Sequence, residues 1–445
     1  MMKRPLLWAK SELRNLSYYY QGLITTILMS SFFIPSANAE INYNFSGFGT
    51  LGYTISDQPF KYLQYIDDQG TFARDSLLAG QLDIKFDPKL SATIQAKIAA
   101  NESQETGLDA DITWAFLSYR PTNDWLFRAG KLQIPGYLNS VNRDVGVTYD
   151  YARLPSEFDS TSPIYSFLGA SVSKTFALAD NEIIIDAYAG KTKAASRYYI
   201  GDDIEGFYQE GADYYKLEVE VVGTSITYKT THNTYLAGLH RATIKKANGQ
   251  PWVKKTGFTD ITPKLGIGYY NDQENSGTTT ANSFDLYIAN IGADIYLSNG
   301  VRLAAELAIR NTNDIETGIN SIAGYISLQK KINNWTPYIF YSQIKTISDD
   351  FKAYSQIDNN QVPNYIPSAS AINASQHVIA DSFEAYDQFS IAIGTSYRFT
   401  PVNMLKAEIM MVQVGKSSSL FDIPSGAASK DYSTTVFSIS YSFAF

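Results

Sequence analysis

One stretch of this 445-residue sequence matches a nucleotide-binding pattern. Residues 47–52 read Gly-Phe-Gly-Thr-Leu-Gly and fit the G-x-G-x-x-G pattern of dinucleotide-binding loops. That pattern holds a pyrophosphate only where a helix begins at the glycines, because the helix N-terminus supplies the N–H donors. Here polar and apolar residues alternate straight through the glycines, which favours a strand. The sequence therefore predicts no nucleotide site.

Catalytic and metal-binding patterns are also missing from the sequence. The chain has no cysteine and only three histidines, His232, His240 and His377, whose positions lack the spacing of zinc ligands. A hydrolase of the Ser–His type needs a serine beside the histidine and a third group that orients the ring. No such spacing stands out. We predict no catalytic residue, no metal and no cofactor, so the chain is not expected to be an enzyme.

The charge balance and the N-terminus indicate export. Acidic residues outnumber basic residues by 44 to 36, which argues against nucleic acid as a partner. A basic leader precedes an apolar run, 23–34, and the tripeptide Ala37-Asn38-Ala39 follows. This order predicts a signal peptide, residues 1–39, cut after Ala39, and a single domain over 40–445. The apolar run is shorter than the roughly 20 residues that a transmembrane helix needs.

From Ile41 onward, apolar and polar residues alternate in segments of about ten residues, the length of a tilted transmembrane strand. A soluble β-sandwich alternates as well, but it buries its apolar face. Two features favour a membrane barrel: charged residues occur in the middle of strands, and short turns alternate with long polar loops. The sequence therefore predicts an all-β fold, a transmembrane antiparallel β-barrel.

Counting the alternating segments in pairs gives sixteen strands, with eighteen as the alternative. The short stretch 265–269 also alternates, and we place it within a fifth external loop, 236–284, rather than in the wall. We expect a turn near Gly223, and we expect Leu217, Val219 and Val221 to face lipid. The sixteen segments lie near 41–55, 77–86, 90–100, 110–120, 125–132, 166–177, 182–190, 213–222, 224–235, 285–297, 301–310, 321–331, 336–346, 385–399, 403–414 and 432–445.

Aromatic residues gather near the predicted strand ends, as in the interfacial girdles of membrane barrels. The high strand propensity of tyrosine and phenylalanine is the alternative explanation. On the first strand, Gly47 and Gly49 fall on the lipid side, where small residues suit either close subunit packing or a bend. The girdle candidates are Tyr43, Tyr53, Trp125, Trp335, Tyr338, Tyr397 and Phe399.

Three stretches resemble the superfamily of Gram-negative outer-membrane porins, in particular its sixteen-stranded trimeric members. FSGFGTLGYT (45–54) is similar to the first strand. RAGKLQIPGYLNSVNRDVGVTYDYARLPSEFD (128–159) is similar to the fifth strand and third loop, and FSISYSFAF (437–445) to the last strand. The PEFGGD-type third-loop motif of the enterobacterial general porins is absent. The resemblance implies a homotrimer in the outer membrane, with lipid and lipopolysaccharide around it.

In that family the third external loop folds into the barrel and narrows it. The resemblance implies that loop residues 133–165 form the constriction and face basic residues on the wall, creating a transverse field across a narrow aqueous passage. The implied constriction residues are Arg143, Asp144, Asp150, Arg153, Glu157 and Asp159. Candidates for the wall, taken from strand parity, are Lys85, Lys97, Arg128, Arg302, Arg310, Arg398 and Lys406.

These expectations combine into a porin for passive diffusion of small hydrophilic solutes and ions. Four acidic against two basic residues between 135 and 165 predict a mild cation preference. Phe445 resembles the signal that the barrel-assembly machinery reads in this family. The alternatives are a substrate-selective porin for sugars or anions, an outer-membrane hydrolase and a surface adhesin. His232 and His240 are expected at or within the fifth loop, and His377 in the seventh.

Overall fold

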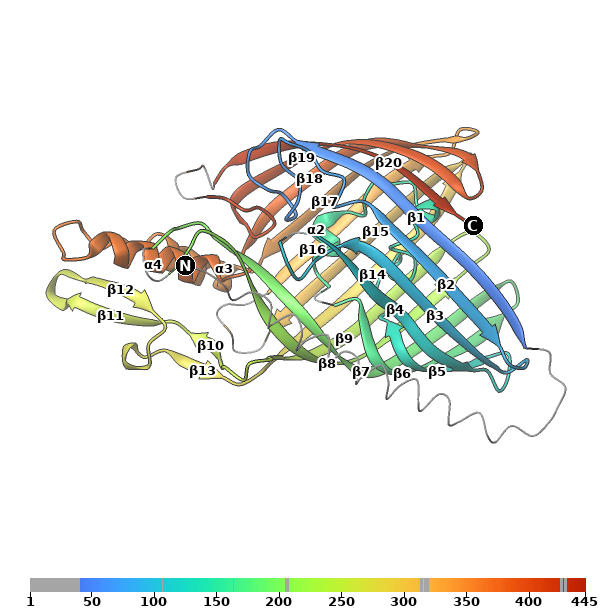
Figure 1. Cartoon of the computed structure of the whole chain (residues 1–445), viewed down its shortest axis with the longest axis horizontal. Coiled ribbons are helices and arrows are strands. Elements are labelled where there is room, and N and C mark those ends of the chain that lie inside the picture. The colour runs from blue at the N-terminus through green and yellow to red at the C-terminus, as the bar shows by residue number, and fades with distance from the viewer. Residues whose placement is uncertain are drawn as a thin grey trace, which may run out of the picture. The chain divides into compact units, whose positions relative to one another are not determined.

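The computed structural model describes residues 41–445 except for 106, 163, 205–207, 313–314, 316–319, 425–426 and 428–429. The predicted signal peptide and its cleavage after Ala39 lie outside the described residues. Sixteen antiparallel strands close into a barrel, each paired with its neighbours in the chain (Figure 1). They are β1 (Asn42–Ser56), β2 (Leu77–Lys85), β3 (Leu90–Ala100), β4 (Leu108–Tyr119), β5 (Trp125–Gln133), β6 (Ser166–Leu178), β7 (Asn181–Ile200), β8 (Gly211–Lys229), β9 (Thr234–Lys246), β14 (Phe284–Ser298), β15 (Val301–Thr312), β16 (Ser321–Lys330), β17 (Trp335–Thr346), β18 (Tyr386–Thr400), β19 (Asn403–Ser418) and β20 (Tyr432–Ala444).

The seam between β1 and β20 closes the ring. Gly47 and Phe445 exchange two backbone hydrogen bonds of 2.9 Å. A Cβ on Gly47 would lie 2.3 Å from the Phe445 ring, and one on Gly49 would lie 2.8 Å from Phe443. The two glycines therefore let the last aromatic rings lie flat across the seam. A closed ring leaves no unpaired strand edge to face hydrocarbon.

Alternation along most of the strands gives the barrel an apolar outside and a largely polar inside. On β15, Leu307 and Ile309 are 40% and 44% exposed on the outer face, while Glu306 and Arg310 are buried inside. Large apolar side chains exposed in this way suit contact with lipid rather than water. No helix among the described residues has the length and apolarity to cross a membrane.

Aromatic rings mark the strand ends on the outer face, with one correction. Trp335 and Phe399 are exposed, and the Trp335 ring lies 4.7 Å from that of Tyr397. Tyr338 was predicted to join this girdle but is buried, and its hydroxyl donates to Glu408 at 2.8 Å. It faces inward because the odd-numbered residues of β17 carry the lipid side.

The predicted turn near Gly223 is wrong. β8 runs through Gly223 without a break, and the chain turns at residues 230–233 instead. A Cβ on Gly223 would lie 2.5 Å from both the Tyr188 hydroxyl and the His240 ring. The glycine leaves room for these two side chains, so it is a packing position and not a turn. His240 consequently lies in β9, and His232 lies in the short turn, not in the fifth loop.

In the part of β8 that precedes Gly223 in the sequence, the inward and outward faces are opposite to the prediction. Leu217, Val219 and Val221 are buried inside, and the alternate residues Glu218 and Glu220 are exposed outside. In this part of β8 the outer face is charged, and the apolar inner face packs into a cluster that includes Ile164 of the third loop and Trp252 of the fifth loop.

The long connections carry small structures of their own. Residues 247–283 hold two two-stranded sheets, β10 (Trp252–Lys255) with β13 (Thr279–Ala281) and β11 (Gly257–Thr262) with β12 (Ile267–Asn271). The ambiguous stretch 265–269 thus belongs to the fifth loop, and sixteen strands are confirmed. The seventh loop forms α3 (Ser348–Asp358) and α4 (Ala369–Asp381), and the second of these helices carries His377.

Candidate functional site

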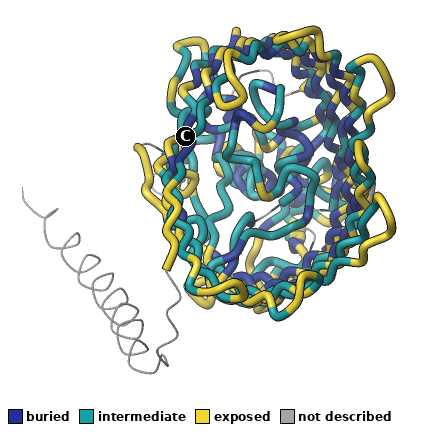
Figure 2. The backbone as a smooth tube through the Cα atoms, turned by 90° about the vertical axis from the view of Figure 1, so that its right-hand side faces the viewer, coloured by how far each residue is buried: buried dark blue, intermediate teal, exposed yellow. Residues whose placement is uncertain are grey.

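The connection between β5 and β6, residues 134–165, is called loop 3 here. In the ring order, β5 and β6 stand opposite β17 and β18. Loop 3 nevertheless contacts those far strands: the Tyr338 hydroxyl accepts from the Ala152 amide at 2.9 Å, and Ser390 donates to Glu157. Contacts to inward-facing residues on the opposite wall require the chain to cross the interior, and Figure 2 shows chain within the ring of strands.

Local sequence shapes loop 3 for this path. Pro155 precedes a single helical turn, α2 (Ser156–Asp159), whose buried Phe158 packs edge-on against Tyr137 and Tyr325. Near the middle of loop 3, Gly146 passes close to the wall, where a Cβ would lie 2.3 Å from the Ser442 hydroxyl. A larger residue at Gly146 would push the loop away from β1 and β20.

Glu157 anchors α2 to the wall. Its carboxylate is fully buried and accepts hydrogen bonds from Gln388 at 2.8 Å and Ser390 at 2.9 Å. Burial raises the pKa of Glu157 above its usual value, and the two donors only partly oppose that rise.

Arg153 joins loop 3 to the first loop. Its guanidinium contacts both oxygens of Asp75, at 2.9 and 2.5 Å, and also the Thr54 hydroxyl. Burial favours the neutral form of Asp75, but Arg153 outweighs it, so the pKa of Asp75 lies below its usual value. Sequence reasoning missed Asp75, because a carboxylate in a long loop carries no sign of its partner.

The remaining loop 3 charges are paired as well. Arg143 donates to Asp159 at 2.7 Å, and its guanidinium lies 3.4 Å from the centre of the Tyr165 ring. Asp144 accepts from Lys97 of β3 at 2.9 Å. Asp150 accepts from Ser396 at 2.6 Å and lies 4.0 Å from Arg398.

Four of the seven predicted wall residues contact loop 3. Besides Lys97, the buried Lys406 donates to the Tyr151 carbonyl at 2.7 Å, Arg398 donates to the Val147 carbonyl at 3.1 Å, and Arg310 donates to the Ser160 carbonyl at 3.3 Å. The other three lie elsewhere: Arg302 pairs with Asp294, Arg128 covers the Phe116 ring, and Lys85 is exposed at the end of β2.

One inward carboxylate holds the loop directly and a second acts through a tyrosine. Glu306 accepts from the Leu138 amide and from Tyr325, both at 2.9 Å. Glu408 accepts from the Tyr338 hydroxyl, which itself accepts from the Ala152 amide of loop 3. Glu306 alternates with the outward Leu307 along β15, so its inward direction follows from strand parity, although its partners do not.

A solvent-open cleft remains on the other side of loop 3. It runs between the loop and β3, β4, β5 and β7, with an empty volume of about 1140 Å³. Trp114 and Tyr165 contribute aromatic surface to it. Its charged lining residues are Lys97, Glu102, Asp109, Asp111, Arg143, Asp144 and Lys193.

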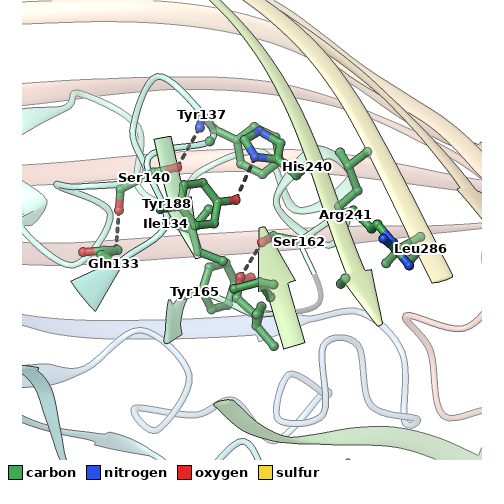
Figure 3. Close-up of a pocket in the computed structure, with 15 residues that line it drawn as sticks. Gln133, Ile134, Tyr137, Ser140, Ser162, Tyr165, Tyr188, His240, Arg241 and Leu286 are labelled. Atoms are coloured by element: carbon green, nitrogen blue, oxygen red, sulfur yellow. Dashed lines mark hydrogen bonds between the residues drawn. The ribbon is translucent and has the colours of Figure 1, made fainter. Parts of the chain in front are cut away.

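A small apolar cavity lies where loop 3 meets β7, β9 and β14 (Figure 3), and a row of hydrogen-bonded side chains lines it. The Tyr188 hydroxyl is 2.8 Å from the His240 Nδ1, and the His240 Nε2 is 3.1 Å from the Asn290 Oδ1. Asn290 in turn donates to the Gly136 carbonyl at 2.6 Å. Asn290 thus fastens the start of loop 3 to the wall, and His240, which no sequence pattern marked, helps to hold the Asn290 side chain in place.

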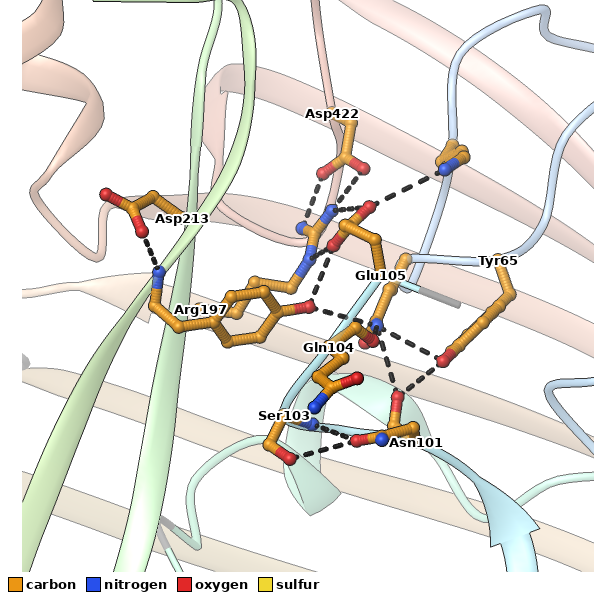
Figure 4. A network of polar contacts seen from close by, with 11 residues as sticks. Tyr65, Asn101, Ser103, Gln104, Glu105, Arg197, Asp213 and Asp422 are labelled. Atoms are coloured by element: carbon orange, nitrogen blue, oxygen red, sulfur yellow. Dashed lines mark hydrogen bonds and ion pairs between the residues drawn. The ribbon is translucent and has the colours of Figure 1, made fainter. Parts of the chain in front are cut away.

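Arg197 ties three segments together at the mouth (Figure 4). Its guanidinium donates to Glu105 of the second loop at 2.8 Å and to Asp422 of the eighth loop at 2.6 and 2.7 Å. Nearby, the buried Tyr62 of the first loop stacks on Phe421 with ring centres 4.6 Å apart. The Arg197 contacts therefore join β7 to the second and eighth loops, and the Tyr62–Phe421 stack packs against β17–β20.

Within the described part of the chain, no group of three or more histidine, aspartate or glutamate side chains is placed to hold a metal ion.

Comparison with known proteins rests on structure. No protein-family model and no curated protein matches the sequence. Among solved structures, OmpT, an outer membrane protein of Vibrio cholerae, aligns over 92% of this chain and 99% of its own, with a TM-score of 0.50 and 11% identity. An anion-selective porin from Comamonas acidovorans aligns over 91% and 100%, with a TM-score of 0.50 and 10% identity. The closed ring, its apolar outside and these alignments agree: the chain has the sixteen-stranded fold of the Gram-negative outer-membrane porins.

Proposed function

We propose that this protein is an outer-membrane porin through which small hydrophilic solutes and ions diffuse passively. The observation that supports it most is the solvent-open cleft between loop 3 and β3–β5, inside a barrel whose outer face is apolar. Water inside and hydrocarbon outside is the arrangement of a transmembrane channel. In this proposal the protein is a channel and not an enzyme.

Loop 3 is proposed as the constriction. Its six charged residues are braced in pairs or by wall donors, and this bracing keeps the loop from collapsing across the cleft. Arg143 and Asp144 line the open side directly, whereas Arg153 and Glu157 support the loop from the closed side. The wall residues Lys406, Arg398 and Arg310 act as supports of the same kind.

The cleft favours cations mildly. Four carboxylates, Glu102, Asp109, Asp111 and Asp144, line it, against the three basic residues Lys97, Arg143 and Lys193. Rings of carboxylates raise the local concentration of cations in a narrow pore.

Planar bilayers test both statements. The purified protein is expected to produce discrete conductance steps, and a tenfold KCl gradient is expected to give a reversal potential with the sign of K⁺ over Cl⁻. The double variant Asp109→Asn/Asp111→Asn should move that potential toward zero. An absence of steps would refute the channel, and a potential of the opposite sign would refute only the cation preference.

A substrate-selective porin, for sugars or anions, is the second candidate. It is favoured by Trp114 and Tyr165 in the cleft, because aromatic faces suit the apolar faces of sugar rings. Swelling of proteoliposomes in sugars, amino acids and organic acids of graded size distinguishes the two. Rates that depend on size alone indicate general diffusion, and one class that is faster than its size allows indicates selectivity.

Export and assembly are part of the proposal. We propose that residues 1–39 are removed after Ala39 and that the barrel-assembly machinery reads Phe445. The Phe445→Ala variant keeps the backbone bonds to Gly47 but loses the ring, and its level in the membrane tests the second point. A homotrimer surrounded by lipid and lipopolysaccharide is proposed from the resemblance, and cross-linking of intact membranes tests it.

A further inference from the structure

We propose that the outer face of β7, β8, β9 and β14 binds a phosphorylated glycolipid of the outer leaflet, with one acyl chain in a groove and the phosphorylated sugars on basic residues above it. This inference requires the chain to lie in the outer membrane but does not depend on what passes through the barrel.

An apolar groove crosses these strands on the lipid side. Small side chains, Ala237 and Ala289, form its floor, and larger ones such as Ile226, Leu239 and Ile309 form its sides. The groove has an empty volume of about 850 Å³, and its lining is almost wholly apolar. Such a channel suits a flexible hydrocarbon chain, because rigid neighbours leave small gaps there that a chain can fill.

A cation stands directly above the groove. Strand pairing sets Val222, Arg241 and Tyr287 side by side. Arg241 lies two residues after Leu239 on β9, so both side chains are on the outer face, with Arg241 nearer the external rim. The side chain of Arg241 is 50% exposed, and one terminal nitrogen donates to Asp285 at 2.8 Å. Arginine has five N–H donors in a planar fork, so a guanidinium held by one carboxylate can still bind a phosphate.

More cations follow on the same outward face. In the next rows of the sheet Lys191 is paired with Glu220, and Glu218 is paired with Lys245. All four side chains are exposed. Together with Lys216, Arg241 and Asp285, this patch holds four basic and three acidic residues, whereas the whole chain has a net charge of −8.

The patch lies at the external rim. The turns at 179–180 and 230–233 are on the opposite, short-turn side of the barrel, and the strands rise from there past Val222 to the lysines. Basic residues placed beside the headgroup region attract anionic lipid. Because the site faces the outer leaflet, its occupant is the phosphorylated glycolipid of that leaflet and not a glycerophospholipid of the inner one.

A neighbouring groove provides an internal comparison. Ala293, Ala305 and Gly324 form a second lipid-side groove across β14–β17. Above it lies one cation, Lys345, which is paired with Asp387 at 3.4 Å. This second groove is also apolar and open to lipid, but it has no cluster of cations above it among the described residues. We therefore expect specific glycolipid binding at the first groove only.

Native mass spectrometry of the detergent-solubilised barrel tests the proposal, with bis-phosphorylated lipid A as the probe. We expect one tightly bound lipid A for each barrel. Arg241→Gln/Lys245→Gln should weaken binding about tenfold or more, since each cation near an anionic lipid surface contributes to affinity. Ala289→Phe, which fills the groove, should weaken it as well. The matched control Lys89→Gln/Lys229→Gln removes two cations at the short-turn rim and should leave binding unchanged.

Dephosphorylated lipid A and phosphatidylglycerol complete the experiment. If both probes bind the native barrel more weakly than bis-phosphorylated lipid A does, the result supports a phosphorylated-glycolipid site. Equal binding of phosphatidylglycerol, equal loss in the control variant, or no loss in Arg241→Gln/Lys245→Gln would each overturn it. All variants should keep their conductance steps, which separates failure of this site from failure of the channel.

Discussion

Buried charges decide where loop 3 lies. Arg153 and Asp75 are 11% and 12% exposed and join segments that are far apart in the sequence. A buried charge without its partner costs about 3–5 kcal/mol, far more than a surface pair contributes. The position of the loop therefore depends on a few specific pairs rather than on general polarity.

Asp75→Asn is expected to destabilise the barrel by about 3–5 kcal/mol, because it leaves the Arg153 guanidinium buried and unneutralised. Asp75→Asn/Arg153→Met should recover part of that loss. Urea unfolding in lipid vesicles measures both variants. Asp68→Asn changes an exposed carboxylate of the same loop and serves as the control. A double variant that is less stable than Asp75→Asn would contradict this account.

Glu157 should make the anchoring of loop 3 pH-dependent. Burial raises its pKa in the folded protein, so the folded state binds the proton more tightly than the unfolded state does. Stability is therefore gained as the pH falls from above the folded pKa toward the unfolded value of about 4.3. Glu157→Gln keeps a group of the same shape and should flatten this dependence. Unfolding midpoints between pH 8 and 4.5 measure it, and an unchanged slope in Glu157→Gln would refute the prediction.

At the scale of the elements, β8 changes character along its length. Val222 is 50% exposed on the outer face, and the next residue on that face toward the external rim is the exposed carboxylate Glu220. We therefore expect lipid around Val222 and water around Glu220. The native chain has no cysteine, so single cysteines report their surroundings cleanly. A charged, impermeant thiol reagent added to intact cells should label Glu220→Cys quickly and both Val221→Cys and Val222→Cys slowly. Fast labelling of Val221→Cys would place the wrong face of β8 outside.

The sequence predicted the strands better than their surroundings. Alternation identified fifteen of the sixteen wall strands, because a side-chain period of two is set locally. It missed β9, since the predicted segments 213–222 and 224–235 both fall mainly in β8, and most of β9 was placed in the fifth loop. The predicted facing was wrong at Leu217–Val221, since the same alternation appears whether lipid or packed loop covers the apolar face. Gly223 was read as a turn because an isolated glycine does not reveal the ring it accommodates.

The sequence indicated the charged residues of loop 3, but it did not predict which residues they contact. All six charged residues proposed in loop 3 contact the wall or each other, yet Asp75 and Glu306 were not among the candidates. Pairs such as Arg153 with Asp75 join residues 78 positions apart. No local pattern contains that information, because only the closed ring brings the two segments together.

At the scale of the whole molecule, the barrel is filled on one side and open on the other. Tyr62 of the first loop, Tyr151 of loop 3 and Phe421 of the eighth loop pack into one apolar cluster against β17–β20. The cleft along β3–β5 lies on the other side of loop 3. The filled half supports loop 3, and the open half is the passage that we propose for solutes.

Blocking the cleft with a thiol reagent tests this division most directly. Ala99→Cys places a thiol in the cleft, and Ala308→Cys places one in the cluster behind Phe158. In planar bilayers a bulky charged methanethiosulfonate should reduce the conductance of Ala99→Cys in steps and leave that of Ala308→Cys unchanged. Unaltered current through Ala99→Cys, with its modification verified by mass, would show that ions do not pass between loop 3 and β3–β5.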